Sequence, residues 1–227
     1  MNMDGDMVDI REFLRESISK NELEVKKYML EEKVSRINDL SNNNGLPPLF
    51  KKKKFSNYNA KYNTAAFNQA KRFVENFPNE KGMLLIGDVG VGKTHIAAGI
   101  ANELNVKLYS SYFGNVVDIM GFVKSTYSKN SLLTELDAIK IITEKIDLLI
   151  IDDLGKENNT EHNLTLLYQI INKLYENEKP LVITTNYTSS ELNRRLGDRS
   201  KAIISRICAM CEPVSLSGKD WRIYNEK

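Results

Sequence analysis

Short apolar runs alternate with longer amphipathic stretches along most of this chain. The runs are almost uninterrupted, as is typical of strands buried on both faces of a sheet, and comprise residues 83–86, 107–113, 147–152, 181–185 and 213–216. Between them, apolar residues recur every three or four positions, the spacing that places them on one side of a helix. These helical stretches are residues 95–104, 115–127, 132–144, 161–177, 189–196 and 201–210. The alternation predicts an α/β fold in which a parallel sheet is covered by helices on both faces, a three-layer α/β/α architecture.

The first forty or so residues follow a different pattern. Apolar residues recur at helical spacing from Val8 to about Leu40, among dense charges and without a proline. Such a stripe is too thin to form a core alone, so it must pack on the rest of the chain or on a partner. The sequence Asn-Asn-Asn-Gly-Leu-Pro-Pro at 42–48 is rich in helix breakers and indicates a boundary. We therefore expect a short helical N-terminal segment at 1–45 and one larger domain at 46–227.

The polar residues after the first apolar run carry the strongest chemical signal in the sequence. Their pattern fits G-x-x-x-x-G-K-[ST], the phosphate loop of nucleotide-binding proteins, and a glycine-rich turn without a ligand is the alternative. Glycine allows the tight turn that points several N–H groups at one anion, the lysine supplies a positive charge, and the hydroxyl supplies a magnesium ligand. The helix that follows directs its positive end at the same phosphates. We expect ATP with Mg²⁺ to bind at Gly87, Asp88, Val89, Gly90, Val91, Gly92, Lys93, Thr94 and His95.

Two adjacent acids end the third apolar run. Asp152 and Asp153 follow four apolar residues that need burial, and carboxylates at the end of a buried strand are costly without a cationic partner. Magnesium bound to the nucleotide would be that partner. We assign Asp152, together with Thr94, to the magnesium shell, and Asp153 to orienting or deprotonating the attacking water. The alternative is an acid pair that caps the next helix.

Polar residues also end the fourth apolar run. If that run lies beside the first one in the sheet, Asn186 can reach the attacking water or the γ-phosphate; otherwise it is an ordinary turn residue at a strand end. Arginines accumulate farther along the chain. An arginine can stabilise the charge that builds up during phosphoryl transfer, and it can come from a neighbouring subunit. The candidates are Arg194, Arg195, Arg199, Arg206 and Arg222.

Two features near the start of the larger domain have two interpretations each. The four lysines at 51–54 form either a solvated linker or a contact to phosphate backbones. A stretch at 64–77 has helical periodicity and contains three phenylalanines. We interpret these aromatic residues as core, and the alternative is that one of them borders the adenine of a bound nucleotide.

Composition adds limits. Thirty-two basic and thirty acidic side chains leave a net charge of +2, too small to indicate a nucleic-acid-binding protein by itself. No apolar run approaches the roughly eighteen residues needed to cross a bilayer, and the N-terminus is acidic, unlike a signal peptide. We therefore expect a cytoplasmic protein without a membrane partner. Cys208 and Cys211 are the only cysteines. Since structural zinc requires four ligands, we expect two reduced thiols rather than a metal site.

Together these motifs resemble the AAA+ ATPases of the DnaC/DnaI helicase-loader and IstB group. The likeness covers roughly residues 46–225 and rests on the phosphate loop, the two acids after the third apolar run, the Thr-Thr-Asn end of the fourth, and the arginine-containing sequence at 196–207. The resemblance implies that Asn186 is the sensor-one residue. It also implies that Arg206 is a finger acting on the ATP of the adjacent subunit and that Arg222 is the sensor-two residue.

The resemblance further implies a function. Loaders of this group bind ATP and single-stranded DNA, form homo-oligomers, hydrolyse ATP, in some cases slowly, and deliver a hexameric replicative DNA helicase during DNA replication. The helical pair at 115–144 would then line the DNA, and the segment at 1–45 would grip the helicase. An IstB-type transposition helper ATPase, which binds duplex DNA and a transposase, and a nucleotide-switched adaptor with little turnover remain alternatives. A small-molecule kinase shares only the phosphate loop.

Overall fold

The computed structural model describes residues 25, 46–78, 81–126, 134–156, 160–197, 200–221 and 223. The chain divides into two units, Met1–Asp39 and Leu40–Lys227, and Val25 is the one described residue of the first unit. The predicted helical segment at 1–45 therefore lies almost entirely outside the described residues, and its boundary stays a prediction. All the other described residues belong to the second unit.

A five-stranded sheet with the order β2-β3-β4-β1-β5 forms the centre of this unit. All its neighbouring strands run parallel, as the apolar runs predict. The strands are β1 (Gly82–Ile86), β2 (Ser111–Gly114), β3 (Leu148–Ile151), β4 (Leu181–Thr185) and β5 (Cys211–Ser215). The expected start of the second strand at 107 is wrong, because the preceding helix continues to Val106 and Leu108 then takes a left-handed backbone conformation, with φ of 64°.

The order of the strands places three carboxyl ends next to one another. β4 lies between β3 and β1, with Val182 level with Ile150 on one side and with Met83 on the other. Residues that follow β1, β3 and β4 therefore meet at one edge of the sheet, which is where parallel α/β sheets bind ligands. The condition set by the sequence for Asn186 to reach the phosphate loop, adjacency of the first and fourth runs, is met.

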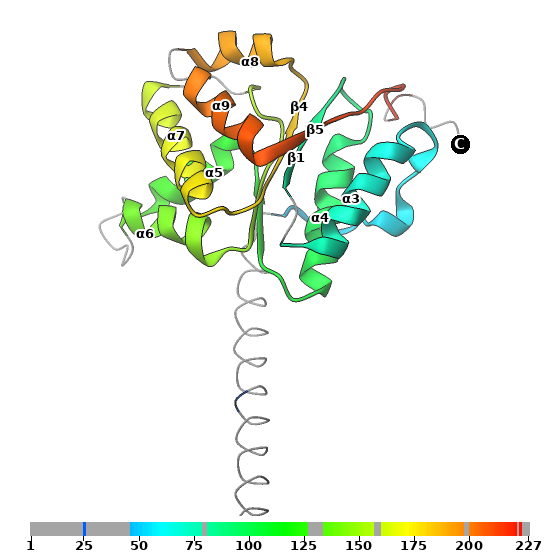
Figure 1. Ribbon diagram of the computed structural model, residues 1–227, viewed down its shortest axis with the longest axis horizontal. Helices are drawn as coiled ribbons and strands as arrows, with labels where there is room; N and C mark the ends of the chain where they lie inside the picture. Colours follow the sequence, from blue (N-terminus) through cyan, green and yellow to red (C-terminus); the bar gives the residue numbers. More distant parts are fainter. Residues whose placement is uncertain are drawn as a thin grey trace, which may run out of the picture. The chain divides into compact units, whose positions relative to one another are not determined.

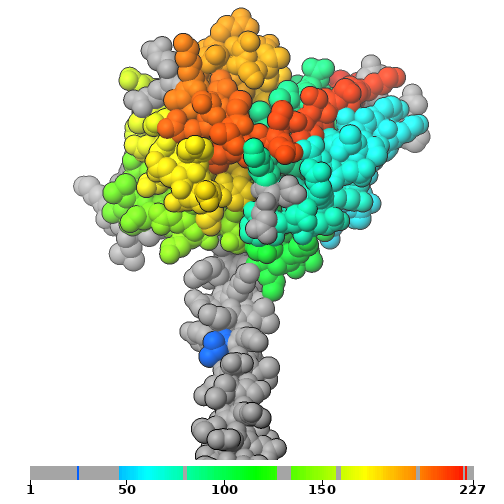
Figure 2. Space-filling view, in the orientation of Figure 1, coloured from blue at the N-terminus to red at the C-terminus, as the bar shows by residue number. Residues whose placement is uncertain are grey.

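Helices cover both faces of the sheet (Figure 1). α3 (Thr64–Asn76) and α4 (Lys93–Val106) lie on one face. The other face carries α5 (Val116–Ser125), α6 (Glu135–Lys140) with its π-helical continuation η3 (Ile141–Lys145), α7 (Glu161–Glu176), α8 (Ser189–Leu196) and α9 (Ser200–Met210). Figure 2 shows α7 in yellow and α9 in orange forming one continuous surface. The predicted three-layer α/β/α fold is confirmed, and no helix among the described residues is long and apolar enough to span a membrane.

Each strand supplies side chains to both layers because successive residues of a strand point to opposite faces. Met83 and Leu85 of β1 lie in the core beneath α3 and α4, whereas Leu84 between them lies in the core beneath α5–α9. Ile150 and Ile151 of β3 divide in the same way. This two-sided burial is the physical reason for the uninterrupted apolar runs in the sequence.

The lysine run belongs to an ordered segment. α2 (Pro48–Lys51), η1 (Phe55–Asn57) and η2 (Ala60–Tyr62) precede α3, and the first two of them pack on α4. The Asn102 side chain of α4 donates hydrogen bonds to the backbone carbonyls of Phe50 (3.0 Å) and Lys53 (2.7 Å). A Cβ on Gly99 would lie 2.6 Å from the Phe55 ring, so only glycine fits beneath that ring. The segment is therefore attached to α4 and is not a free linker, whereas the side chains of Lys51, Lys52 and Lys54 are exposed to solvent as expected.

Candidate nucleotide-binding site

The loop between β1 and α4 has the backbone geometry that its glycines predict. Gly92 is the N-cap of α4 and has φ of 103°, a left-handed conformation that glycine adopts without steric cost. A Cβ at this position would also lie 3.0 Å from the Tyr58 ring. At the start of the loop, a Cβ on Gly87 would lie 2.2 Å from the backbone oxygen of Leu216. Both ends of the loop are thus packed too closely for a side chain.

Lys93 lies inside this loop. Its side chain is buried, and the Nζ atom donates hydrogen bonds to the backbone oxygens of Gly87 (2.7 Å) and Asp88 (2.6 Å). These bonds are short because the donor carries a charge. They hold a positive charge in the concave side of the loop, at the N-terminal end of α4, where an anion is favoured.

Asp152 lies at the centre of a second hydrogen-bonded group. Its Oδ1 atom accepts bonds from the hydroxyls of Thr94 (3.0 Å) and Thr184 (2.7 Å). Burial raises the pKa of the Asp152 carboxyl above its ordinary value, an effect opposed by the bond from Thr184. Burial disfavours the charged form of a carboxylate unless a cation lies close to it. The Thr94 hydroxyl and the Asp152 carboxylate are oxygen ligands held close together, which suits a hard cation such as magnesium. The residue types and their contacts therefore fit a magnesium ion at Thr94 and Asp152.

Asp153 follows with an unusual backbone. Its φ is 56°, in the left-handed region that aspartate enters more readily than most residues, and its N–H donates to the Thr184 hydroxyl at 2.8 Å. The Nζ atom of Lys156 lies 3.3 Å from the Asp153 Oδ2 atom. The interpretation of the two acids as a helix cap is wrong, because the next helix, α7, is capped by the Thr160 side chain, which accepts a hydrogen bond from the N–H of Asn163.

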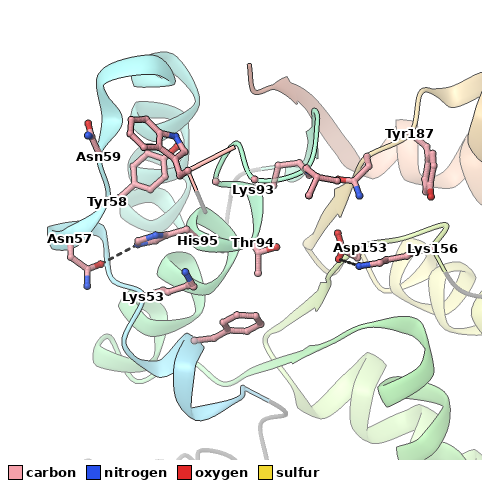
Figure 3. Close-up of a pocket in the computed structure, with 16 residues that line it drawn as sticks. Lys53, Asn57, Tyr58, Asn59, Lys93, Thr94, His95, Asp153, Lys156 and Tyr187 are labelled. Carbon is pink, nitrogen blue, oxygen red and sulfur yellow. Dashed lines mark hydrogen bonds and ion pairs between the residues drawn. The ribbon is translucent and has the colours of Figure 1, made fainter. Parts of the chain in front are cut away.

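A pocket of about 530 Å³ joins these elements. Figure 3 shows its two sides, with Thr94 between them: residues of the segment before α3, together with His95, on one side, and Asp153, Lys156 and Tyr187 on the other. The pocket is lined by Phe50, Lys53, Asn57, Tyr58, Asn59, Val89, Gly90, Gly92, Lys93, Thr94, His95, Asp153, Lys156, Asn186, Tyr187 and Trp221. Of the predicted site residues, the pocket brings together Asp153, Asn186 and the phosphate-loop residues Val89, Gly90 and Gly92–His95. The predicted residues Gly87, Asp88, Val91 and Asp152 do not line it.

One side of the pocket is a wall that the sequence did not predict. Tyr58 stacks on Phe67 with ring centroids 5.1 Å apart, and its edge contacts the ring of His95, also at 5.1 Å. The Nε2 atom of His95 lies 3.2 Å from the backbone oxygen of Lys54 and 3.1 Å from Oδ1 of Asn57. The interpretation of the phenylalanines at 64–77 as core is confirmed, because Phe67, Phe73 and Phe77 are all buried. Tyr58 lines the pocket instead, and its signal is an aromatic- and asparagine-rich sequence in an expected loop.

Residues of the C-terminal segment contact the phosphate loop. Asn63 joins the two: its side chain donates to the backbone oxygen of Val91 (3.2 Å) and accepts from the N–H of Ser217 (3.0 Å). The N–H of Trp221 donates to the Gly90 oxygen at 3.3 Å, and Trp221 lines the pocket. Arg222, the next residue, lies outside the described residues, as does Arg199.

Arg206 lies elsewhere. It belongs to α9 and donates hydrogen bonds to Oδ1 of Asn172 (2.6 Å) and to the hydroxyl of Tyr168 (3.2 Å), both on α7. It does not line the pocket. Arg195 contacts a residue that lines the pocket: its guanidinium stacks over the Tyr187 ring at 3.9 Å.

The two cysteines lie on consecutive elements and differ in exposure. Cys211 is buried at the start of β5, Cys208 is exposed on α9, and both are free thiols. Burial raises the pKa of the Cys211 thiol. No group of three or more histidine, cysteine or acidic side chains that could hold a metal ion occurs among the described residues.

Comparison with known proteins places this chain in a family of ATP-binding proteins. The family model described as IstB-like ATP binding protein matches residues 21–227. The replicative helicase loader DnaC of Escherichia coli (strain K12) is 29% identical over 187 residues, which cover 81% of this chain and 71% of that protein.

Solved structures give the same result. A crystal structure of the DnaC helicase loader superposes with a TM-score of 0.65 and 27% identity, covering 75% of this chain and 100% of that one. The crystal structure of DnaI gives a TM-score of 0.63 and 26% identity, covering 77% and 93%. DnaA of Aquifex aeolicus shares the fold, with a TM-score of 0.62 at 23% identity over 76% of this chain and 51% of that one. The chain therefore belongs to the IstB-like ATP-binding family, and its described domain is a DnaC-like AAA+ domain.

Proposed function

We propose that this protein is an ATP-dependent loader of a replicative DNA helicase. The observation that carries the proposal is the likeness to the DnaC helicase loader and to DnaI over about three quarters of the chain. The likeness is accompanied by a pocket in which Lys93, Asp153 and Asn186 face one space.

The part of the pocket around Lys93 and Thr94 would bind the phosphates of ATP. The loop amides and the Lys93 ammonium would hold the β- and γ-phosphates. Thr94 and Asp152 would hold magnesium, which when bound neutralises phosphate charge and draws electrons from the γ-phosphorus. Asp153 would accept a proton from the attacking water or orient it, and Asn186 would hold the same water or the γ-phosphate from the neighbouring strand.

The part of the pocket around Tyr58 and Trp221 would bind the adenine base. Tyr58 and Trp221 line the pocket with flat aromatic surfaces, and the nearby Asn59 has an amide able to hydrogen-bond a base edge. An adenine enclosed there would leave its triphosphate directed at Lys93. The pocket thus offers aromatic surfaces for a base and the Lys93 ammonium for phosphates.

The remaining parts of the loader proposal concern partners. Arg206 would act on the ATP of a neighbouring copy, which requires a homo-oligomer assembled on ATP and DNA, and Arg222 would complete the site as the sensor-two residue. The pair α5 and α6 would line single-stranded DNA, and the segment at 1–45 would grip the helicase. Hydrolysis would then release the helicase onto the DNA.

Co-purification tests the proposal. Tagged protein is recovered from its host with ATP, the bound proteins are identified by mass spectrometry, and binding is repeated with the purified helicase. We expect the hexameric replicative helicase to be retained by the wild type and retention to fall in Lys93→Ala. Recovery of a transposase with no helicase would reject the loader function.

A transposition helper is the second candidate, because the matching family model is described as IstB-like. Such a protein should bind duplex DNA in the presence of ATP and should bind a transposase. Gel-shift assays with single-stranded and duplex DNA of equal length separate the two functions. Preference for the single strand favours the loader, and preference for the duplex favours the helper.

A further inference from the structure

The turn after β3 brings a lysine onto the acid that is proposed to face the attacking water. Asp153 and Gly155 both have left-handed backbones, with φ of 56° and 92°. The N–H of Lys156 donates to the Asp153 backbone oxygen at 3.3 Å and closes the turn. The chain therefore folds back, and the Lys156 ammonium lies 3.3 Å from the Asp153 carboxylate (Figure 3).

Lys156 differs from the other two lysines that line the pocket. Lys93 is buried and bonded to the loop backbone. Lys53 comes from the segment before α3, on the side of Tyr58, and its Nζ atom lies 6.0 Å from the centre of the Phe50 ring. The Lys156 side chain is 67% exposed and pairs with the Asp153 carboxylate. An exposed ion pair of this kind is weak, so a stronger anion can displace the carboxylate.

We propose that Lys156 detects the γ-phosphate of ATP. When ATP binds, the Lys156 ammonium leaves the Asp153 carboxylate and pairs with that phosphate. The γ-phosphate carries more negative charge than one carboxylate, and Asp153 lines the same pocket as Lys93, which makes the exchange favourable. ADP has no γ-phosphate, so Lys156 remains on Asp153. The inference rests on the proposed ATP site and names the residue that separates ATP from ADP.

The exchange has a consequence for the acid. A carboxylate paired with an ammonium has less lone-pair capacity left to accept a water hydrogen, because the lysine already occupies part of it. Asp153 is released only when the γ-phosphate has taken the lysine. The water-activating group is then available in the ATP state and occupied in the ADP state.

Nucleotide affinities test this inference. Isothermal titration calorimetry with Mg·ATPγS and with Mg·ADP is performed on the wild type and on Lys156→Ala. We expect the affinity for Mg·ATPγS to fall about fivefold, the scale of one exposed ion pair, and the affinity for Mg·ADP to stay within about twofold. Lys156→Arg should keep the wild-type ratio. Equal losses for both nucleotides, or an unchanged ratio, would overturn the inference.

Lys53→Ala is the matched control, because it removes a second pocket lysine from the opposite side. It should weaken both nucleotides by the same factor. Asp153→Asn is the second variant: without the competing carboxylate, the preference for Mg·ATPγS should increase, and Lys156→Ala should then cost more than it does in the wild type. No helicase or DNA is used, so a protein that loads no helicase still reports on Lys156.

Discussion

Lys93 and Arg206 are both predicted to meet ATP, and the structure places them in contrasting surroundings. Lys93 lies within the pocket of its own chain, held by backbone oxygens of the loop that precedes it. Arg206 lies on α9 against Asn172 and Tyr168 and does not line that pocket. A charge that serves its own site is fixed by nearby backbone. Arg206, which we propose to act on a neighbouring copy, is held instead by side chains of another helix.

Lys93→Ala should have the largest effect. It removes the ammonium from the loop and the two hydrogen bonds that the ammonium makes, so Mg·ATP binding should fall by about a hundredfold or more, or about 3 kcal/mol. Calorimetry measures the affinity, and circular dichroism confirms the fold. Unchanged affinity would remove the phosphate-loop assignment and, with it, the contrast to Arg206.

Asp153→Asn should come next. The variant keeps the side-chain shape but loses the ability to accept a proton, so hydrolysis should fall by about a hundredfold to a thousandfold while Mg·ATP still binds. Phosphate release and calorimetry give the two numbers. A variant that hydrolyses ATP normally would show that another group handles the water.

Arg206→Ala should lose hydrolysis only in assemblies, by on the order of a hundredfold or more. Mixing it with Lys93→Ala should restore part of the activity, since each variant supplies the half that the other lacks. The readout is phosphate release at several mixing ratios. Failure to rescue, with both proteins folded and associating, would count against a site shared between copies.

Asn172→Ala is the control for this experiment, because it removes one of the hydrogen-bond partners of Arg206 within the chain but keeps the guanidinium. If Arg206 were only a link between α7 and α9, both variants should lower the melting temperature by similar amounts and neither should affect hydrolysis specifically. We expect Asn172→Ala to retain most of the activity in assemblies.

A smaller effect should come from pH and concerns His95, in the wall that it forms with Tyr58. Burial lowers the pKa of His95 below 6.5, so the unfolded chain binds more protons than the folded one as the pH falls through that value. Acidification below pH 6.5 should therefore destabilise the protein slightly, and His95→Gln should remove that part of the loss. Thermal melts between pH 7.5 and 5.5 measure it. An identical pH dependence in both proteins would show that His95 is not its source.

The sequence predicts best what depends on neighbouring residues. The phosphate loop, the Asp152–Asp153 pair and the uninterrupted strands are short patterns with a direct physical cause, and their elements lie at the expected positions. The ends of elements are predicted less accurately. For example, Leu108 has a left-handed backbone and β2 begins only at Ser111, and the hydrophobic pattern indicates neither.

The sequence does not predict contacts between distant segments. Nothing near Tyr58 shows that its ring will stack on Phe67 and line the pocket, because that contact depends on how the segment before α3 packs on α4. The pairing of Lys156 with Asp153 is local in sequence, but it depends on two left-handed residues in one turn. Aspartate tolerates that conformation without requiring it.

The attachment of residues 50–57 to α4 has a mechanical consequence. The chain that enters this domain is fastened by Asn102 and His95 to the helix whose first turn forms the floor of the phosphate loop. A pull on the preceding residues would therefore load that helix directly. Conversely, any tilt of the helix would move the entering chain, because the two are joined by these hydrogen bonds.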